Sequence, residues 1–323
     1  MYGIKHYTIF FCVLCLSGVA WGQQQMIYVT QSLITVECQD CELNGSLMMP
    51  ETDSVNTVVL FISGAADTDR DCNQGMMRTN AFRMLASELA SYNFASVRYD
   101  KRGVGSSRQQ PIAPEDLRID HFISDAKEWI KMLKRDRRFS KVIVLGHSEG
   151  SLVALAACAD NKYVDGVISI SGVGRTMDQV LKDQFTGQPH QVREVAIDII
   201  NSMQRGQTVD QVPVYLTHIL TPAKQPFLIS TMHYNPQVEA RRLKCPYMVV
   251  QGENDIELRI EDAKLLSAAH GKAKLVTIPG MNHVMKDCTT NDPGMQLMTY
   301  ANPTLPLNRQ LVLELAKFIK TIK

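Results

Sequence analysis

The chain has 323 residues, of which 45% are hydrophobic and 21% are charged, which suits one large α/β domain or a core domain with an insert. It carries 34 lysines and arginines against 33 aspartates and glutamates. The net charge is therefore close to zero, and it gives no indication that the chain binds a nucleic acid or an anionic membrane surface.

The N-terminal segment has the pattern of a secretory signal. Lys5 and His6 precede an apolar run over residues 9–16, and the small residues Ala20 and Gly22, on either side of Trp21, offer a cleavage site before Gln23. The apolar run is short for a bilayer span, which leaves an uncleaved anchor as the less favoured alternative. We therefore expect residues 1–22 to be removed and the mature chain to be exported, periplasmic or extracellular, with no membrane span.

Patterns of hydrophobicity predict the elements that follow. Alternating or apolar residues over 26–37 and 43–49 indicate an antiparallel hairpin. Further strands are predicted over residues 57–63, 94–99, 142–145, 164–170, 247–251 and 273–278. Helices are predicted over residues 80–90, 119–135, 151–157, 260–269 and 309–321.

This alternation predicts an α/β fold with a mostly parallel central sheet and helices on both of its faces. The alternation of strands and helices stops between residues 175 and 244, where no parallel strand is predicted and prolines separate helical patches. We therefore interpret that segment as a helical insert. The predicted division is a first core part over 23–174, a cap over 175–244 and a second core part over 245–323. Ligands of such sheets bind beyond the carboxyl ends of the strands.

The strongest motif is Gly-His-Ser-Glu-Gly at residues 146–150, between a predicted strand and a predicted helix. Gly146 and Gly150 are needed because a Cβ at either position would crowd the tight turn. The turn lifts the hydroxyl of Ser148 clear of the sheet and directs the backbone N–H of Glu149 toward developing negative charge. The loop after the strand at 57–63 should supply a second such donor, the backbone N–H of Ala65.

Two more residues with complementary chemistry each follow a predicted strand. His283 can take the proton of Ser148 as the hydroxyl attacks, because imidazole titrates near neutral pH. Asp255 is placed to fix the imidazole tautomer and to stabilise the imidazolium. The three residues should meet at one edge of the sheet, and the chain order Ser, Asp, His is typical of this arrangement.

The sequence leaves rivals for two of these roles. Glu253 and Glu257 lie in the same loop as Asp255 and could replace it. His147 precedes the nucleophile, but its side chain should point away from Ser148, so we interpret it as a packing or loop contact.

Export would permit disulfides among the six cysteines outside the signal segment. The Cys38-x-x-Cys41 spacing could be half of a metal site, but no second Cys/His pair at ligand spacing exists, so a local disulfide or two free thiols is favoured. Cys72 and Cys288 fall in loops expected near the mouth of the site, and we hypothesise that they pair. No metal or organic cofactor is implied.

The chain resembles the α/β-hydrolase superfamily, and it is most similar to bacterial carboxylesterases of the serine aminopeptidase-like group. The resemblance extends from about residue 27 to the C-terminus. It rests on Gly-His-Ser-Glu-Gly at 146–150, Gln-Gly-x-x-Asp at 251–255, Gly-Met-Asn-His at 280–283, Thr-Asp-Arg-Asp at 68–71 and Tyr-Asp-Lys-Arg-Gly at 99–103. It implies the α/β-hydrolase fold, hydrolysis of esters with short acyl chains, Ser148 as the nucleophile and a cap over the site.

The chain departs from that group in the loop that should hold the oxyanion. Relatives usually carry Ser-Gly-Ser-Gly-Pro where this chain has Ser-Gly-Ala-Ala-Asp at 63–67. Asp67 is either a solvated loop charge or a carboxylate that disfavours anionic substrates or holds an amine. Neighbouring loops carry a dense charged set, which we interpret as an ion-pair network that braces the loop rather than as a substrate contact: Asp69, Arg70, Asp71, Asp100 and Arg102.

The sequence therefore predicts a secreted serine-dependent carboxylesterase that acts on a small-molecule ester through an acyl-enzyme. An aminopeptidase or acyl-peptide hydrolase with the same Ser148, Asp255 and His283 is the second prediction. A non-catalytic binding protein on the same fold is the alternative from another class. The apolar patches of the insert can close over the site, open as a lid or join two subunits, which leaves a homodimer open.

Overall fold

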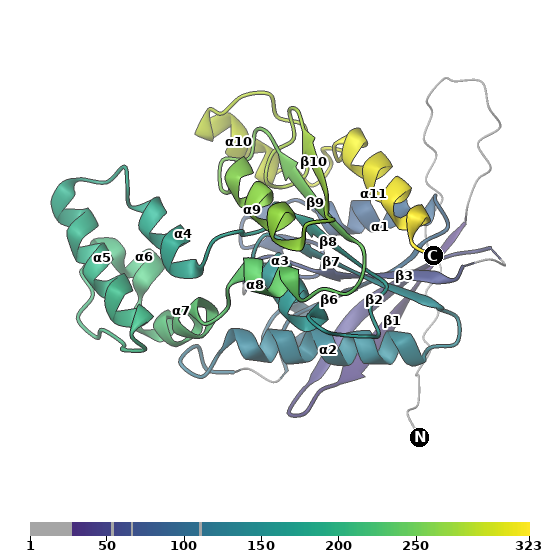
Figure 1. The fold of residues 1–323 in the computed structure, drawn as a ribbon, viewed down its shortest axis with the longest axis horizontal. Coiled ribbons are helices and arrows are strands. Elements are labelled where there is room, and N and C mark those ends of the chain that lie inside the picture. The colour runs from purple at the N-terminus through teal and green to yellow at the C-terminus, as the bar shows by residue number, and fades with distance from the viewer. Residues whose placement is uncertain (1–27, 53–54, 66, 110–111) are drawn as a thin grey trace.

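A computed structural model describes residues 28–52, 55–65, 67–109 and 112–323 (Figure 1). The predicted signal segment, residues 1–22, lies outside the described residues. Across the part of the chain that is described, no helix combines the length and the apolar character that crossing a bilayer requires.

An eight-stranded sheet forms the centre of the molecule, with strand order β1-β2-β6-β3-β7-β8-β9-β10. Its first two neighbouring pairs, β1·β2 and β2·β6, are antiparallel, and all later pairs are parallel. Every residue of β3 and β9 is buried, which explains why these strands carry nearly continuous apolar runs. The strands are Val29–Glu37 (β1), Glu42–Pro50 (β2), Thr57–Ile62 (β3), Ala95–Tyr99 (β6), Lys141–His147 (β7), Gly166–Ile170 (β8), Tyr247–Gly252 (β9) and Lys274–Ile278 (β10).

Helices cover both faces of this sheet, as predicted (Figure 1). One face packs against α2 (Ile119–Arg135), α3 (Glu149–Cys158), α8 (Pro236–Arg241) and α9 (Ile260–His270). The other face packs against α1 (Ala81–Ala90) and α11 (Arg309–Thr321). The helix α2 shows how the sequence specifies this packing, because its apolar residues recur at helical spacing and all are buried: Phe122, Ala126, Trp129, Ile130 and Leu133.

Between β8 and β9 the chain forms helices that project beside the sheet as a lobe (Figure 1). These are α4 (Met177–Gln184), α5 (His190–Gln204), α6 (Thr217–Leu220) and α7 (Gln225–Met232), with 3₁₀ turns at Val214–Leu216 and Pro222–Lys224. The lobe has its own apolar cluster, which includes Phe185, Ile200 and Leu220. The next helix, α8, packs on the core helices α3 and α9 instead. The predicted boundaries of the insert at 175 and 244 stay a prediction.

The structure also contains elements that the sequence patterns do not indicate. They are a small two-stranded sheet of β4 (Asn73–Gln74) and β5 (Met77–Arg78), a 3₁₀ turn at Gly105–Ser107, and the helix α10 (Pro293–Tyr300). All six cysteines of the described residues are free thiols. The hypothesised Cys72–Cys288 disulfide is therefore absent from the structure, in which Cys72 is buried in an apolar cluster and Cys288 is only partly buried.

Candidate active site

The turn between β7 and α3, which carries Ser148, has a strained backbone. Ser148 adopts φ 54° and ψ −125°, a conformation that costs about 1–3 kcal/mol and persists where the surroundings enforce it. A Cβ added at Gly146 would lie 2.3 Å from the carbonyl oxygen of Gly150, and one added at Gly150 would lie 2.4 Å from that of Ile62. Both glycines are therefore required by close backbone contact, as the sequence predicts.

Two of the three predicted residues meet directly. Asp255 follows β9 and His283 follows β10, and these strands are parallel neighbours whose carboxyl ends share one edge of the sheet. The Nδ1–H of His283 donates to Asp255 with distances of 2.9 Å to Oδ2 and 3.1 Å to Oδ1. Ser148 follows β7 at the same edge. No hydrogen bond joins Ser148 to His283 in the part of the chain that the structure describes.

The carboxylate of Asp255 is buried and surrounded by donors. Its Oδ1 accepts the backbone N–H groups of Glu257 and Leu258, both at 2.9 Å, and its Oδ2 accepts from Nε2 of Gln251 at 2.9 Å. Burial alone would raise the pKa of Asp255, but His283 and these donors outweigh it and hold the pKa well below its usual range. Asp255 is therefore an ionised, fixed partner for the imidazole.

The other ring nitrogen of His283 faces a second carboxylate. Its Nε2 lies 3.3 Å from Oε2 of Glu257, whose side chain is 47% exposed. The Oε1 of Glu257 accepts from the hydroxyl of Tyr300 at 2.7 Å, which holds this carboxylate in place. Burial would lower the pKa of His283, but Asp255 and Glu257 stabilise the imidazolium and raise it to about 9.

The three acidic residues that could partner His283 differ in their contacts. Asp255 contacts Nδ1 and Glu257 contacts Nε2, while Glu253 is exposed in the same loop. The contact of Glu257 with Nε2 is not indicated by the sequence, because its anchor Tyr300 belongs to α10. That helix has no apolar periodicity that would mark it, and Met295, Leu297 and Met298 on it are exposed.

His147 contacts the loop of His283. Its Nε2–H donates to the carbonyl oxygen of His283 at 2.8 Å, and the two rings lie 4.8 Å apart between centroids. Burial lowers the pKa of His147 to about 3, so its ring is neutral at neutral pH. The predicted packing or loop contact is confirmed.

A buried lysine fixes the loop that should supply the second oxyanion donor. The Nζ of Lys101 donates to Oγ of Ser63 at 3.0 Å, to the carbonyl oxygen of Ala65 at 2.8 Å and to that of Gly64. A Cβ on Gly64 would lie 3.2 Å from Cβ of Ser148, so this loop runs directly beside Ser148. Burial lowers the pKa of Lys101 to about 8. Sequence reasoning noted Lys101 only within a motif and missed this role.

Four of the five residues in the charged set around this loop form ion pairs within the protein, as expected, while Asp69 accepts the backbone N–H groups of Asp71 and Asn73, both at 2.8 Å. Arg70 binds Asp100 at 2.6 Å, and Arg98 pairs with Asp71. Arg102 binds Asp125 of α2 at 2.7 Å. The carboxylate of Asp67 instead lies on the exposed side of the loop and accepts from Nε2 of Gln74 at 2.5 Å.

Residues 74–287, more than half of the chain, match the model of the family described as serine aminopeptidase, S33. The chain belongs to this family. It is 26% identical over 252 residues to the esterase EstD of Thermotoga maritima, which covers 75% of this chain and 58% of that protein. It is 32% identical over 109 residues to a probable aminopeptidase, YbaC, of Bacillus subtilis, which covers 34% of this chain and 31% of that protein. The matches thus cover less than two thirds of the length of either relative.

Solved structures share the fold of this S33 family member. Est1E from Butyrivibrio proteoclasticus superposes with a TM-score of 0.60 at 16% identity, over 89% of this chain and 99% of that one. The α/β hydrolase GrgF from Penicillium sp. sh18 gives a TM-score of 0.60 at 15% identity, over 90% and 98% of the two chains. The predicted α/β-hydrolase fold is confirmed.

Proposed function

We propose that this chain is an exported serine hydrolase that cleaves carboxylic esters, with a preference for short acyl groups, through an acyl-enzyme on Ser148. The observation that carries the proposal is the contact of Asp255 with His283 at the sheet edge where the strained turn presents Ser148. Membership of a hydrolase family and the similarity to the esterase EstD support it. Export and a cap formed by residues 175–244 are part of this proposal.

The proposed reaction uses each group in turn. Nε2 of His283 takes the proton of Ser148 as Oγ attacks the ester carbonyl, while Asp255 stabilises the imidazolium through Nδ1–H. The oxyanion accepts the backbone N–H groups of Glu149 and Ala65. His283 then protonates the leaving alcohol. In the second half of the reaction His283 takes a proton from water, which attacks the acyl carbonyl, and the proton returns to Oγ of Ser148 as the acid leaves. In the first step Nε2 of His283 must leave Glu257 and form a hydrogen bond with Ser148. Catalytic hydrogen bonds that are absent from a resting site often form only when the substrate binds.

Hydrolysis of an N-terminal peptide bond is the second candidate. The same residues would perform it, with an amine as the leaving group in place of an alcohol. The observation that favours it is the 32% identity with the probable aminopeptidase of Bacillus subtilis, although that match covers only 34% of this chain.

A substrate panel distinguishes the candidates. Wild type and Ser148→Ala would be assayed with p-nitrophenyl esters from acetate to long chains and with an aminoacyl p-nitroanilide. The proposal predicts serine-dependent ester turnover that is greatest for a short chain. Faster turnover of the anilide would favour the peptidase, and no turnover of either class would favour the non-catalytic alternative.

The pH profile of ester hydrolysis should depend on Glu257. His283 must be neutral to act as the base, so kcat/KM should rise with pH through the pKa of about 9. Glu257→Gln removes a negative charge that stabilises the imidazolium, so this pKa should fall and the rising limb should move to lower pH. The measurement is kcat/KM against pH for a neutral ester. Glu253→Gln, an exposed acid in the same loop, is the control, and an equal shift there or no shift in Glu257→Gln would contradict the account.

Replacing Lys101 should loosen the oxyanion loop. Lys101→Met removes the charged donor from the carbonyls of residues 63–65, and kcat should fall by about 100-fold, as on loss of an oxyanion donor. The same change should cost about 2–3 kcal/mol of unfolding free energy, because buried carbonyls lose bonds to a charged group. Ester kinetics and urea unfolding measure the two effects. The exposed Lys244→Met serves as the control, and an unchanged kcat in a folded Lys101→Met variant would refute the role.

A further inference from the structure

The tip of the β1–β2 hairpin places two cysteines side by side. The register of the hairpin pairs Glu37 with Glu42, so Cys38 and Cys41 are the next residues toward the turn. The backbone N–H of Cys38 donates to the carbonyl oxygen of Cys41 at 2.8 Å, which closes the turn. Residues opposite one another in an antiparallel pair project to the same face, so the two thiols share one side of the hairpin.

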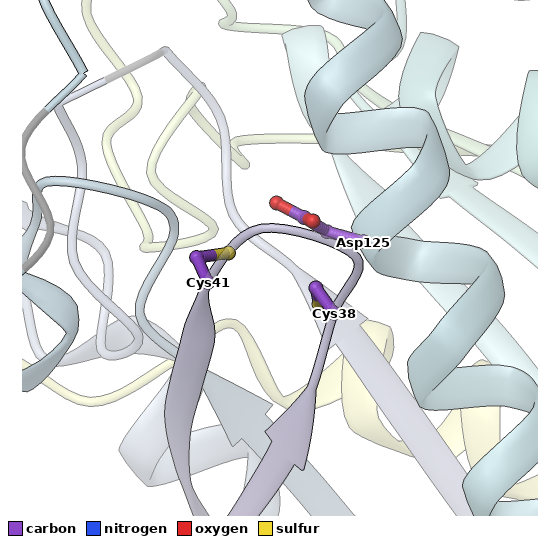
Figure 2. A group of neighbouring side chains, drawn as sticks. All are labelled: Cys38, Cys41 and Asp125. Carbon is purple, nitrogen blue, oxygen red and sulfur yellow. The ribbon is translucent and has the colours of Figure 1, made fainter.

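A carboxylate from a distant part of the chain completes the cluster. Asp125 lies in the middle of α2, where its side chain is 1% exposed and faces the hairpin tip (Figure 2). One ligand atom from each of Cys38, Cys41 and Asp125 lies within 4.8 Å of the other two. The sequence suggests only the Cys-x-x-Cys half of this group, because the third member is an aspartate that packing brings into place.

Arg102 holds the carboxylate in a defined orientation. Its Nε and Nη2 donate to Oδ2 and Oδ1 of Asp125, both at 2.7 Å, and its Nη1 pairs with Asp40 of the turn at 2.7 Å. The thiol of Cys38 also hydrogen-bonds the carboxylate of Asp125, so the sulfur and a carboxylate oxygen already face one another. Carboxylates that bind metals are often held by a hydrogen-bond donor of this kind. The guanidinium also offsets part of the negative charge that two thiolates would bring.

We propose that Cys38, Cys41 and Asp125 form a binding site for a thiophilic divalent cation such as Zn²⁺, with water as the fourth ligand. Thiolate sulfurs select zinc and related soft metals over Mg²⁺ and Ca²⁺. Ligand atoms around a tetrahedral zinc lie about 3.5–4 Å apart, so small side-chain rotations would close the present cluster around the ion. Binding forms two Zn–S bonds in place of two S–H bonds and releases both protons to solvent.

The proposed ion would act as a structural link. It would join the hairpin tip to α2 and to the loop after β6, from which Arg102 comes, and none of its ligands belongs to the site around Ser148. This inference is independent of the proposed ester hydrolysis, so its test does not use activity.

Metal titration of the reduced, chelator-treated full chain tests the proposal. Zn²⁺ binding, measured by competition with a chromophoric chelator, should approach about one ion per chain. Co²⁺ should give a thiolate charge-transfer band and the visible bands of a tetrahedral site. Cys41→Ser should weaken binding by at least about 100-fold. Cys245→Ser, which changes a partly buried thiol elsewhere, should bind as wild type does. Asp125→Asn should weaken binding while the Co²⁺ charge-transfer band remains.

Two results would overturn the site. One is that the reduced wild type binds no zinc. This result counts against the site even if thiol titration before reduction shows a Cys38–Cys41 disulfide. The other is zinc binding that Cys41→Ser leaves unchanged, because the metal would then bind elsewhere. Either result would leave the proposed function unaffected, since neither Cys38 nor Cys41 contacts the residues that perform it.

Discussion

Ser148→Ala should lower kcat for a p-nitrophenyl ester by about 10⁶-fold, to the level supplied by substrate binding and the oxyanion donors alone. The hydroxyl oxygen forms the covalent bond in the proposed reaction, and no other side chain on the turn can replace it. Initial rates at saturating substrate measure the effect. Circular dichroism and the unfolding midpoint should match wild type, because Ser148 makes no side-chain cap bond in the turn.

Ser140→Ala provides a matched control for that result. Ser140 precedes the opposite, amino end of β7 and is exposed, so its loss tests the effect of removing a hydroxyl near the same strand. Its kcat should equal that of wild type. If Ser148→Ala kept more than about one hundredth of the wild-type rate, the covalent mechanism would be wrong.

Asp255→Asn should reduce kcat by about 10⁴-fold with little change in KM. An amide at this position can present its NH₂ group toward Nδ1, which favours the tautomer with the proton on Nε2 and prevents that nitrogen from accepting the proton of Ser148. It also removes the charge that stabilises the imidazolium. Steady-state kinetics of the same ester give kcat and KM separately.

Glu257→Gln discriminates between the two carboxylates that contact His283. We expect this change to move the pH profile while the rate at high pH stays within about 10-fold of wild type. Asp255→Asn, in contrast, should lose rate at every pH. If Glu257→Gln caused the greater loss, Glu257 and not Asp255 would be the partner on which His283 depends.

Much of the fold and of the proposed site follows from local sequence patterns. The parallel strands carry apolar runs because both faces of the sheet are covered, and α2 has the periodicity that its buried face requires. The glycines at 146 and 150 specify the tight turn of Ser148. Because parallel strands end at the same edge, the sequence places the loop of Asp255 beside His283, but the choice of Asp255 over Glu253 and Glu257 depends on the structure.

Other contacts depend on packing that no local pattern records. Tyr300 on α10 hydrogen-bonds the carboxylate of Glu257 that meets His283, and α10 is short and partly covered. In the sequence Lys101 resembles an ordinary loop charge. In the fold it is buried and its Nζ donates to carbonyl oxygens of the neighbouring loop. Asp125 lies within a predicted helix, and its position beside the hairpin cysteines follows only from the tertiary fold. In each case a polar group acts on a residue far from it in the chain.

Covalent labelling tests directly whether Ser148 is the nucleophile. Wild type would be incubated with a p-nitrophenyl alkylphosphonate, which transfers its phosphonyl group to an activated serine and releases p-nitrophenol. The intact mass and the modified peptide would then be determined. We expect one phosphonyl group per chain on Ser148, and no labelling of Ser148→Ala or after protonation of His283 at low pH. Labelling at another residue, or none in a folded protein, would contradict the assignment of Ser148 as the nucleophile.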